Sequence, residues 1–281
     1  MKLHSINTGY FKLDGGAMYG VVPKSIWNKL NPADDNNMCN WALRSLLVEY
    51  DNKLVLIDNG IGDKQDEKFF SHYYLHGDDT LEKSLHKAGF GMDEITDVFL
   101  THLHFDHCGG SIRWNKDRTG YEPAFKNATY WSNTEHWEWA TKPNPREKAS
   151  FLKENILPVS ESGQLKHTTD GAELFPGFRV KFVHGHTGAM MIPHIQYKDI
   201  TLVYMADLLP STGHIPVPFV MAYDTRPLIS LDEKAQFIKE AAAGNYHLFF
   251  EHDPVHECCT VKDVEGRVKL DRTFPLSEIV G

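Results

Sequence analysis

Four cysteines are few for a chain of 281 residues, and the sequence also lacks long apolar segments. Cys39, Cys108, Cys258 and Cys259 show neither a paired metal-binding spacing nor a disulfide pattern. The first ten residues lack the apolar run after a basic start that marks a signal peptide, and no run reaches the length of a membrane span. These absences predict a cytoplasmic protein that does not enter a membrane.

An excess of positive charge is also absent. The chain carries 29 lysines and arginines against 38 aspartates and glutamates, and its net charge is -9 at pH 7. Because phosphate backbones repel a surface of this sign, we expect no nucleic-acid partner and a small molecule as the substrate. Nothing in the sequence indicates an oligomeric state.

Repeats, low-complexity stretches and linkers are missing as well, so a single domain over residues 1–281 is predicted. Strand and helix patterns alternate along the chain, and strand-strand hairpin signals recur among them. This mixture favours a layered α/β domain with mixed sheets over a purely parallel sheet.

The expected elements follow from apolar periodicity and turn residues. Asp51-Asn52 and Lys198-Asp199 each join two strands, and Gly89 ends a helix. The predicted strands cover residues 43–50, 53–58, 95–100, 128–131, 178–183, 192–197, 200–205 and 246–250. The predicted helices cover 80–88, 231–243 and a helical insertion near the site at about 132–158, which Asn133 or Thr134 would cap.

What the sequence does contain is a dense cluster of metal-binding side chains. The six residues His102-Leu103-His104-Phe105-Asp106-His107 directly follow the predicted strand 95–100. Imidazole and carboxylate are the ligands of zinc and similar divalent ions. His102 and His104 leave an extended backbone on the same side, whereas Asp106 and His107 are adjacent. We therefore expect a turn into a helix, made with Gly109-Gly110, so that the two pairs face two neighbouring ions.

Three further predicted strands end in residues of the same kind. His186 follows strand 178–183, Asp207 follows strand 200–205, and His252 follows strand 246–250. Sites in layered α/β proteins gather where strands end. Two ligand sets are therefore expected, with Asp207 offering one oxygen to each ion. The first set is His102, His104 and His186, and the second is Asp106, His107 and His252.

A pair of metal ions would supply a hydroxide as the nucleophile, so the reaction would not need a nucleophilic side chain. Ions about 3.5–4 Å apart can share a hydroxide, because a bound metal lowers the pKa of water from about 15.7 towards about 7. One ion also polarises the carbonyl or phosphoryl oxygen under attack. The sequence has no Gly-x-Ser-x-Gly nucleophile elbow.

Several residues near these motifs keep two interpretations. Asp58 could orient a metal-bound imidazole, or it could close the turn after its strand. His184 shares the alternation of His186 and could be a ligand in its place. Cys108 could be a small packing residue, or it could have a ligand or redox role.

The motif and its companions resemble the metallo-β-lactamase superfamily. The resemblance rests on the His102–His107 motif, Gly185-His186-Thr187, Asp207, His252 and the early segment Leu54–Gly60. It implies an αβ/βα sandwich with a zinc site, and it favours His186 over His184. Two zinc ions are the expected cofactor, although manganese, iron or cobalt would accept the same ligands.

A narrower resemblance points to the quorum-quenching N-acyl-homoserine lactone lactonases. It rests on Asp14–Lys24, Ala206–Pro210 and Ala222-Tyr223-Asp224, and the sequence departs from it at Gly188-Ala189-Met190. The resemblance implies a lactone-opening hydrolase. An organophosphate or aryl-ester hydrolase with the same metals is the first alternative, and an iron-dependent oxidoreductase on the same fold is the second.

The catalytic candidates are Asp106, His214 and Tyr223. Asp106 is also a predicted metal ligand, and His214 lies seven residues after Asp207 on a loop expected to reach the substrate. There an imidazole could donate a proton to the opening ring, although it could equally cap its loop and face water. Three further residues could line an apolar acyl pocket or pack in the core: Met18, Tyr19 and Trp27.

Overall fold

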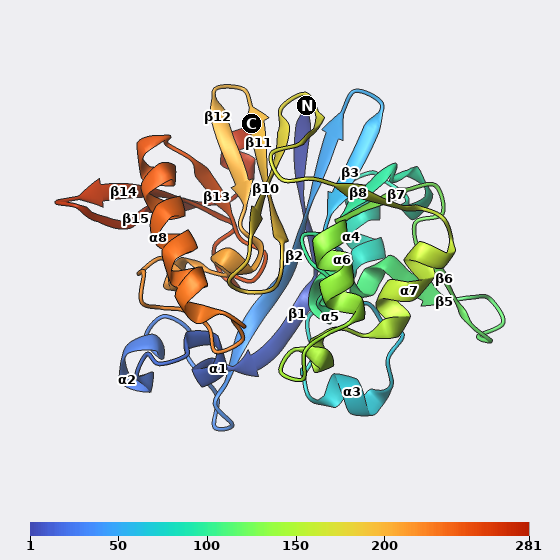
Figure 1. Cartoon of the computed structure of the whole chain (residues 1–281), viewed down its shortest axis with the longest axis horizontal. Coiled ribbons are helices and arrows are strands. Elements are labelled where there is room, and N and C mark those ends of the chain that lie inside the picture. The colour runs from blue at the N-terminus through green and yellow to red at the C-terminus, as the bar shows by residue number, and fades with distance from the viewer. Residues whose placement is uncertain (281) are drawn as a thin grey trace. The chain divides into compact units, whose positions relative to one another are not determined.

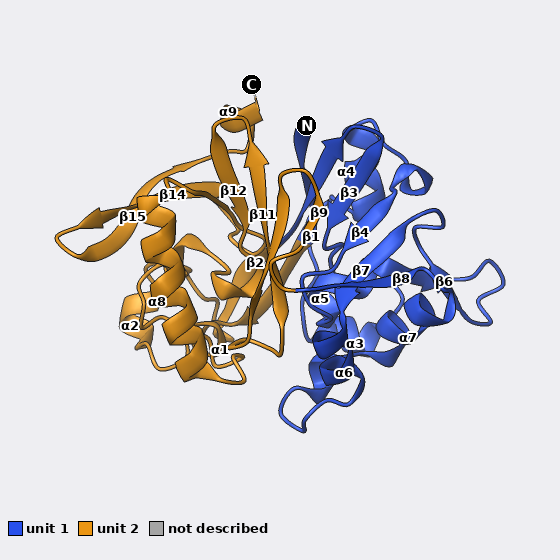
Figure 2. Ribbon diagram, turned by 45° about the horizontal axis from the view of Figure 1, so that its top comes forward, with its two compact units in different colours: residues 1–9, 43–169 blue, residues 10–42, 170–281 orange. Residues whose placement is uncertain are grey.

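The computed structural model describes residues 1–280, which form two compact units (Figure 2). The first unit comprises residues 1–9 and 43–169, and the second comprises residues 10–42 and the chain from residue 170 on. Strands β1 (Lys2–Asp14) and β2 (Met38–Tyr50) contribute residues to both units. The single domain expected over residues 1–281 stays a prediction, as does the description of residues 132–158 as an insertion.

The first unit contains a mixed sheet in the order β1-β2-β3-β4-β7-β8 (Figure 1). β2 and β3 form the predicted antiparallel hairpin, and β3, β4, β7 and β8 run parallel. The carboxyl ends of these parallel strands therefore lie at one edge, where Asp58 follows β3 and His102 follows β4. The last four strands of the sheet are β3 (Lys53–Ile57), β4 (Asp97–Phe99), β7 (Thr129–Asn133) and β8 (Leu165–Thr168).

Strand β4 is shorter than the predicted 95–100. Residues Met92–Glu94 form a 3-10 turn that ends at Ile95, so the strand begins two residues later than its apolar pattern suggests. The strand still ends just before the metal-binding motif, because His102 lies three residues after Phe99, which pairs with Ile57 of β3.

Three of the five helices in the first unit begin at a residue whose polar side chain caps them. Thr80 accepts a hydrogen bond from the backbone N–H of Lys83, and Asn133 accepts one from His136, as a helix N-cap requires. The helices are α3 (Glu67–Ser71), α4 (Leu81–Lys87), α5 (Phe105–Cys108), α6 (Thr134–Thr141) and α7 (Lys153–Glu161). A separate hairpin consists of β5 (Ile112–Trp114) and β6 (Tyr121–Pro123).

The second unit contains a sheet in the order β15-β14-β13-β12-β11-β10-β9 (Figure 1). Adjacent strands in this sheet pair antiparallel, except that β12 and β13 pair parallel. Its strands are β9 (Glu173–Phe175), β10 (Phe178–Val183), β11 (Met190–Tyr197), β12 (Ile200–Tyr204), β13 (His247–Phe249), β14 (Cys258–Val264) and β15 (Arg267–Phe274). The predicted α/β class with mixed sheets and flanking helices is therefore confirmed.

Helix α8 (Pro227–Ala243) contacts β14 and β15 and buries Phe237, Ile238 and Ala241. It begins four residues before the predicted start at Leu231, because Pro227 suits the first helical position. The short helices of this unit are α1 (Gly15–Tyr19), α2 (Lys24–Trp27) and α9 (Ser277–Val280).

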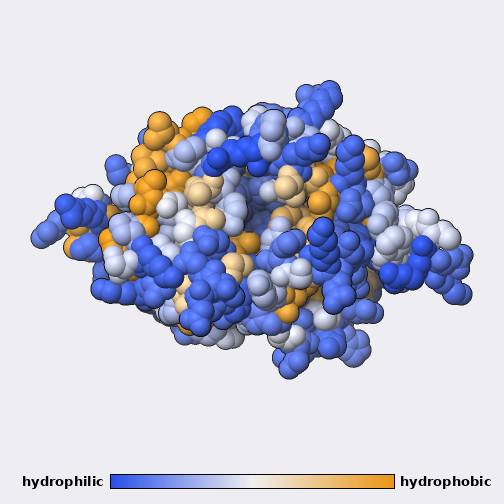
Figure 3. Space-filling model, turned by 90° about the horizontal axis from the view of Figure 1, so that it is seen from below, coloured by the Kyte–Doolittle hydropathy of each residue, from blue (hydrophilic) through white to orange (hydrophobic). Residues whose placement is uncertain are grey.

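One face of the molecule is mostly polar. Figure 3 shows this face as largely hydrophilic, with an apolar band at its upper left and smaller apolar areas elsewhere. Some large apolar residues are exposed, such as Val21 at 93% and Leu228 at 77%, and exposed apolar residues are ordinary for a folded protein. Among residues 1–280, no helix combines the length and the apolarity needed to cross a bilayer.

Candidate metal centre

The first unit carries four candidate ligands in one buried turn. His104 lies at the N-cap of α5, and the backbone N–H groups of His107 and Cys108 donate to its carbonyl oxygen. The helix thus begins at Phe105, before Gly109, and this early start reverses the chain between His104 and Asp106. His102 Nε2 lies 3.1 Å from His104 Nδ1, and His107 Nε2 lies 3.7 Å from Asp106 Oδ2.

Each imidazole of this turn is held through its other ring nitrogen. His102 Nδ1 lies 3.0 Å from Thr101 Oγ1, and His107 Nδ1 lies 3.1 Å from Asp58 Oδ2. His104 Nε2 lies 3.0 Å from Glu147 Oε1. Such contacts fix the ring orientation and the tautomer, and they are typical of metal-binding histidines.

Asp58 satisfies both interpretations that its sequence allowed. Its backbone has a φ of 53°, so it closes the turn after β3. Its carboxylate also accepts hydrogen bonds from the backbone N–H and the hydroxyl of Thr101, at 2.8 and 2.6 Å. Since the same carboxylate contacts His107, Asp58 holds two parts of the ligand turn in place.

Gly109 and Gly110 have a different role from the predicted one. Gly109 lies beyond α5 and has an ordinary negative φ, so it does not supply the turn. A Cβ atom at Gly109 would overlap the backbone of Ile61, and one at Gly110 would overlap the carbonyl of Asn59. These glycines are therefore required because two backbone segments pass at close range.

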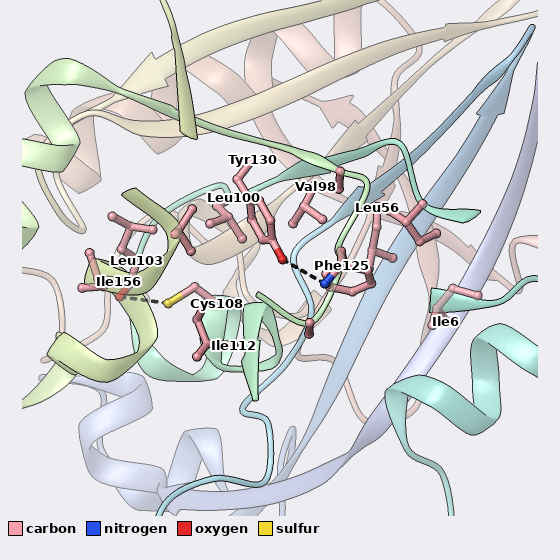
Figure 4. Close-up of a cluster of buried hydrophobic side chains, with 14 of the residues drawn as sticks. Ile6, Leu56, Val98, Leu100, Leu103, Cys108, Ile112, Phe125, Tyr130 and Ile156 are labelled. Atoms are coloured by element: carbon pink, nitrogen blue, oxygen red, sulfur yellow. Dashed lines mark hydrogen bonds between the residues drawn. The ribbon is translucent and has the colours of Figure 1, made fainter. Parts of the chain in front are cut away.

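Cys108 is a packing residue. Its thiol donates to the carbonyl oxygen of Leu103 inside the apolar cluster of the first unit (Figure 4). Burial raises the pKa of this thiol to about 12, so the thiolate that would bind a metal is disfavoured. Cys39, Cys258 and Cys259 are also buried free thiols.

The second unit carries three candidate ligands at strand ends, as predicted. His186 follows β10, Asp207 follows β12 in a 3-10 turn (Ala206–Leu208), and His252 follows β13. Asp207 Oδ2 lies 3.0 Å from His186 Nε2, and Asp207 Oδ1 lies 3.3 Å from His252 Nε2. The carboxylate thus directs one oxygen at each imidazole.

These two imidazoles are also fixed from behind. His186 Nδ1 lies 2.8 Å from Asp224 Oδ1, and His252 Nδ1 lies 2.8 Å from the carbonyl oxygen of Ala42. Burial opposes a charged ring, but the carboxylates of Asp207 and Asp224 outweigh it and raise the pKa of His186 to about 10. This excess of negative charge is what a bound cation would neutralise.

The ring of His186 lies beside the carboxylate of Asp207, as a ligand would, whereas the ring of His184 contacts the backbone. His184 is half-buried, and its Nδ1 accepts the backbone N–H of Ala189. The Glu233 carboxylate of α8 accepts the N–H groups of His184 and Gly185 at 2.6 and 2.9 Å, and so holds the turn before His186.

The donor sets of both units fit divalent metal ions. Within its unit, each set combines imidazole with carboxylate, and every imidazole has a hydrogen-bonding partner on its second nitrogen. Each of the seven residues, taken with its backbone, is exposed at 8% or less, and they are His102, His104, Asp106, His107, His186, Asp207 and His252.

His214, a predicted catalytic residue, lies in the interior of the second unit. It is 1% exposed, and its ring stacks on Tyr19 with centroids 4.5 Å apart. Nε2 lies 2.9 Å from the carbonyl oxygen of Met18, and Nδ1 lies 2.8 Å from Ser211 Oγ. Both ring nitrogens therefore have partners within the protein. The ring therefore does not face water, and its contact with substrate stays a prediction.

The residues around His214 are core residues. Met18, Tyr19 and Trp27 are exposed at 2% or less, and the rings of Tyr19 and Trp27 stack. They pack in the interior, which was the second interpretation of the sequence. Tyr223 is 40% exposed, and a role in substrate contact stays a prediction for it.

A substitution of His214 should reduce the free energy of unfolding. Burial and the nearby Lys234 lower the pKa of His214 to about 3, so the folded state keeps it neutral. As pH falls below about 6.5, the unfolded chain takes up the proton first and stability is lost. His214→Ala should cost about 2–4 kcal/mol near neutral pH and flatten this decline, measured by denaturant unfolding from pH 7 to 4.

The exposed His72 provides the control, since His72→Ala should leave both quantities unchanged. Unchanged stability together with a reduced turnover in His214→Ala would contradict the interior role and restore the predicted contact with substrate.

Three residues that support the ligands were not recognised from the sequence. Glu147 and Asp224 lie 43 and 38 positions from the imidazoles they contact, and no local pattern connects them. Asp224 belongs to a segment singled out by resemblance, but its neighbour Tyr223 was chosen. The third is His136, which accepts the backbone N–H of Leu103 at 2.8 Å inside the ligand turn.

Comparison with known proteins decides the family. Residues 44–252 match the family described as the Metallo-beta-lactamase superfamily, and this stretch is well over half of the chain. The chain belongs to that superfamily. The family predicted from the His102–His107 motif is thereby confirmed.

Several known proteins are similar to this chain over nearly its whole length. The N-acyl homoserine lactonase AiiA of Bacillus thuringiensis subsp. kurstaki is 23% identical over 270 residues, which cover 90% of this chain and 93% of the relative. A probable metal-dependent hydrolase from Staphylococcus aureus has a TM-score of 0.86 at 29% identity, covering 97% and 95% of the two chains. AidC, a dizinc quorum-quenching lactonase, has a TM-score of 0.77 at 24% identity with the same coverage. These structures confirm the metallo-β-lactamase fold.

Proposed function

We propose that this superfamily member is a dinuclear-metal hydrolase that opens the ester ring of lactones such as N-acyl-homoserine lactones. The observation that carries the proposal is Asp207, whose two oxygens are directed at two different imidazoles. The lactonases AiiA and AidC, which are similar to the chain over nine-tenths or more of its length, support the choice of substrate.

The proposed ligand sets combine the two groups of residues. One ion would bind to His102, His104 and His186, and the other to Asp106, His107 and His252, with Asp207 between them. Zinc is the proposed metal, and manganese, iron or cobalt would suit the same donors. When bound, a metal pair supplies an acidified water and an electrophile for the carbonyl oxygen of the lactone.

The side chains of the protein orient the ligands, move protons and contact the substrate. Thr101, Asp58 and Asp224 each hold an imidazole in one orientation, which keeps the ligand geometry ready before substrate arrives. Asp106 is the proposed carboxylate for proton movement, because its side chain keeps 12% of its surface exposed. Tyr223 is a proposed substrate contact, since it is exposed beside Asp224, which holds His186.

A substrate panel tests the proposal. The purified protein should hydrolyse an N-acyl-homoserine lactone far faster than a β-lactam or an aryl phosphotriester, and chelation of its metal should abolish the reaction. Lactone turnover no faster than buffer, with metal present and phosphotriester cleaved, would replace the proposal with the organophosphate or aryl-ester hydrolase. Iron as the bound metal, without hydrolysis of any of the three, would favour the oxidoreductase. The cytoplasmic location stays a prediction.

A further inference from the structure

The segment between α6 and α7 presents a buried carboxylate to the ligand turn of the same unit. Glu147 is 4% exposed and precedes a 3-10 turn (Lys148–Ser150). Asn144 fixes its backbone, because the side-chain oxygen of Asn144 accepts the N–H groups of Arg146 and Glu147 at 3.0 and 3.1 Å. The position of Glu147 is thus built into the local chain.

Three donors hold the carboxylate of Glu147. Its Oε2 accepts from the indole N–H of Trp139 at 2.7 Å and from the side-chain amide of Asn144 at 3.1 Å. Its Oε1 lies 3.0 Å from Nε2 of His104. An ionised carboxylate can only accept, so it favours the His104 tautomer with the proton on Nε2 and the lone pair on Nδ1. That lone pair is directed at Nε2 of His102, 3.1 Å away.

The five candidate imidazoles differ in the charge of the group that contacts their second ring nitrogen. His107 and His186 have the carboxylates of Asp58 and Asp224, whereas His102 and His252 have a hydroxyl and a backbone carbonyl. The second nitrogen of His104 also faces a carboxylate, and Glu147 supplies it from a segment 43 positions away.

We propose that Glu147 is a positioning residue that fixes His104 as an Nδ1 ligand and strengthens the binding of one of the two ions. This inference rests on the proposed function, because it needs the metal site. It assigns a role to residues 142–150, which deliver a carboxylate that makes the imidazole a better electron donor to the metal. The effect should be confined to the ion bound by His104, and the ion bound by His107 should be unaffected.

Zinc titration of Glu147→Gln against a competing chelator tests the proposal. Glutamine keeps the size of the side chain but removes the charge, and its amide can donate as well as accept, so the His104 tautomer is no longer fixed. The affinity for one ion should fall about 10–100-fold, with the second ion bound as in the wild type. In the wild type, the indole N–H resonance of Trp139 should also shift when zinc binds, and this shift should be smaller in the variant.

The exposed Glu138 of α6 provides a matched control, and Glu138→Gln should bind both ions as the wild type does. If Glu147→Gln does not fold, Trp139→Phe removes a single donor to the carboxylate and should weaken the same ion by a few-fold. If folded Glu147→Gln binds each ion with the same affinity as the wild type, the proposed role of Glu147 is wrong. That result would leave the proposed function intact. A wild-type protein that binds no metal would overturn the proposed function together with the role of Glu147.

Discussion

Asp207→Ala should lower the affinity for both metal ions and reduce lactone turnover by more than about 100-fold. Loss of a residue that only supports a ligand typically costs about 10–100-fold in metal affinity or activity, and Asp207 is proposed to ligate both ions directly. Its two oxygens lie 3.0 and 3.3 Å from the ring nitrogens of His186 and His252. Metal analysis after dialysis, together with lactone kinetics, measures both effects.

Asp199→Ala is the control for this substitution. Asp199 is exposed in the turn between β11 and β12, and its loss should leave metal content and turnover unchanged. An Asp207→Ala protein that retains both ions with wild-type affinity would show that Asp207 does not bridge them.

Gly109→Ala should destabilise the protein and release its metals, although Gly109 is not a proposed ligand. The new methyl group would overlap the backbone of Ile61, and neither backbone segment can move without displacing the turn that holds Asp106 and His107. The side-chain amine of Lys64 also donates to the Gly109 carbonyl oxygen, which fixes the position of this segment. Overpacking of this kind costs about 1–3 kcal/mol or more in the free energy of unfolding.

Gly120→Ala provides the comparison for Gly109→Ala. A Cβ atom at Gly120 would meet only Asn115 Nδ2, at an ordinary 3.7 Å, so this variant should unfold like the wild type. Denaturant unfolding and metal analysis of both variants test the prediction. Wild-type stability in Gly109→Ala would mean that the close approach of the two segments is not required.

The ligand turn was predictable because its chemistry is local. His102, His104, Asp106 and His107 lie within six positions after an apolar strand, and a ligand motif of this length needs no knowledge of the fold. The strand ends before His186, Asp207 and His252 were predictable for the same reason, since each follows a short apolar run.

Among the residues that hold the ligands, Asp58 was a candidate from the sequence, whereas Glu147 and Asp224 could not be predicted. Glu147 reaches His104 only because the chain returns after α6, and Asp224 reaches His186 across 38 positions. The sequence around His214 indicates a loop. Its burial becomes evident only from the tertiary structure, in which its ring stacks on Tyr19. Long-range contacts of this kind depend on the tertiary structure and leave no spacing in the sequence.

Strands β1, β14 and β15 were missed for a different reason. The burial of β1 does not alternate with a period of two, and most residues of β15 are exposed. An apolar alternation is the signal of a half-buried strand, and these strands do not carry it. Pairing with a neighbour determines their structure, as in the register of β14 with β15.

Counting the metal ions in the purified chain tests the central claim most directly. Elemental analysis after gel filtration should give two divalent ions per chain, and removal and return of zinc should abolish and restore the opening of an N-acyl-homoserine lactone. A single tightly bound ion per chain, or lactone turnover that survives complete removal of metal, would contradict the dinuclear hydrolase.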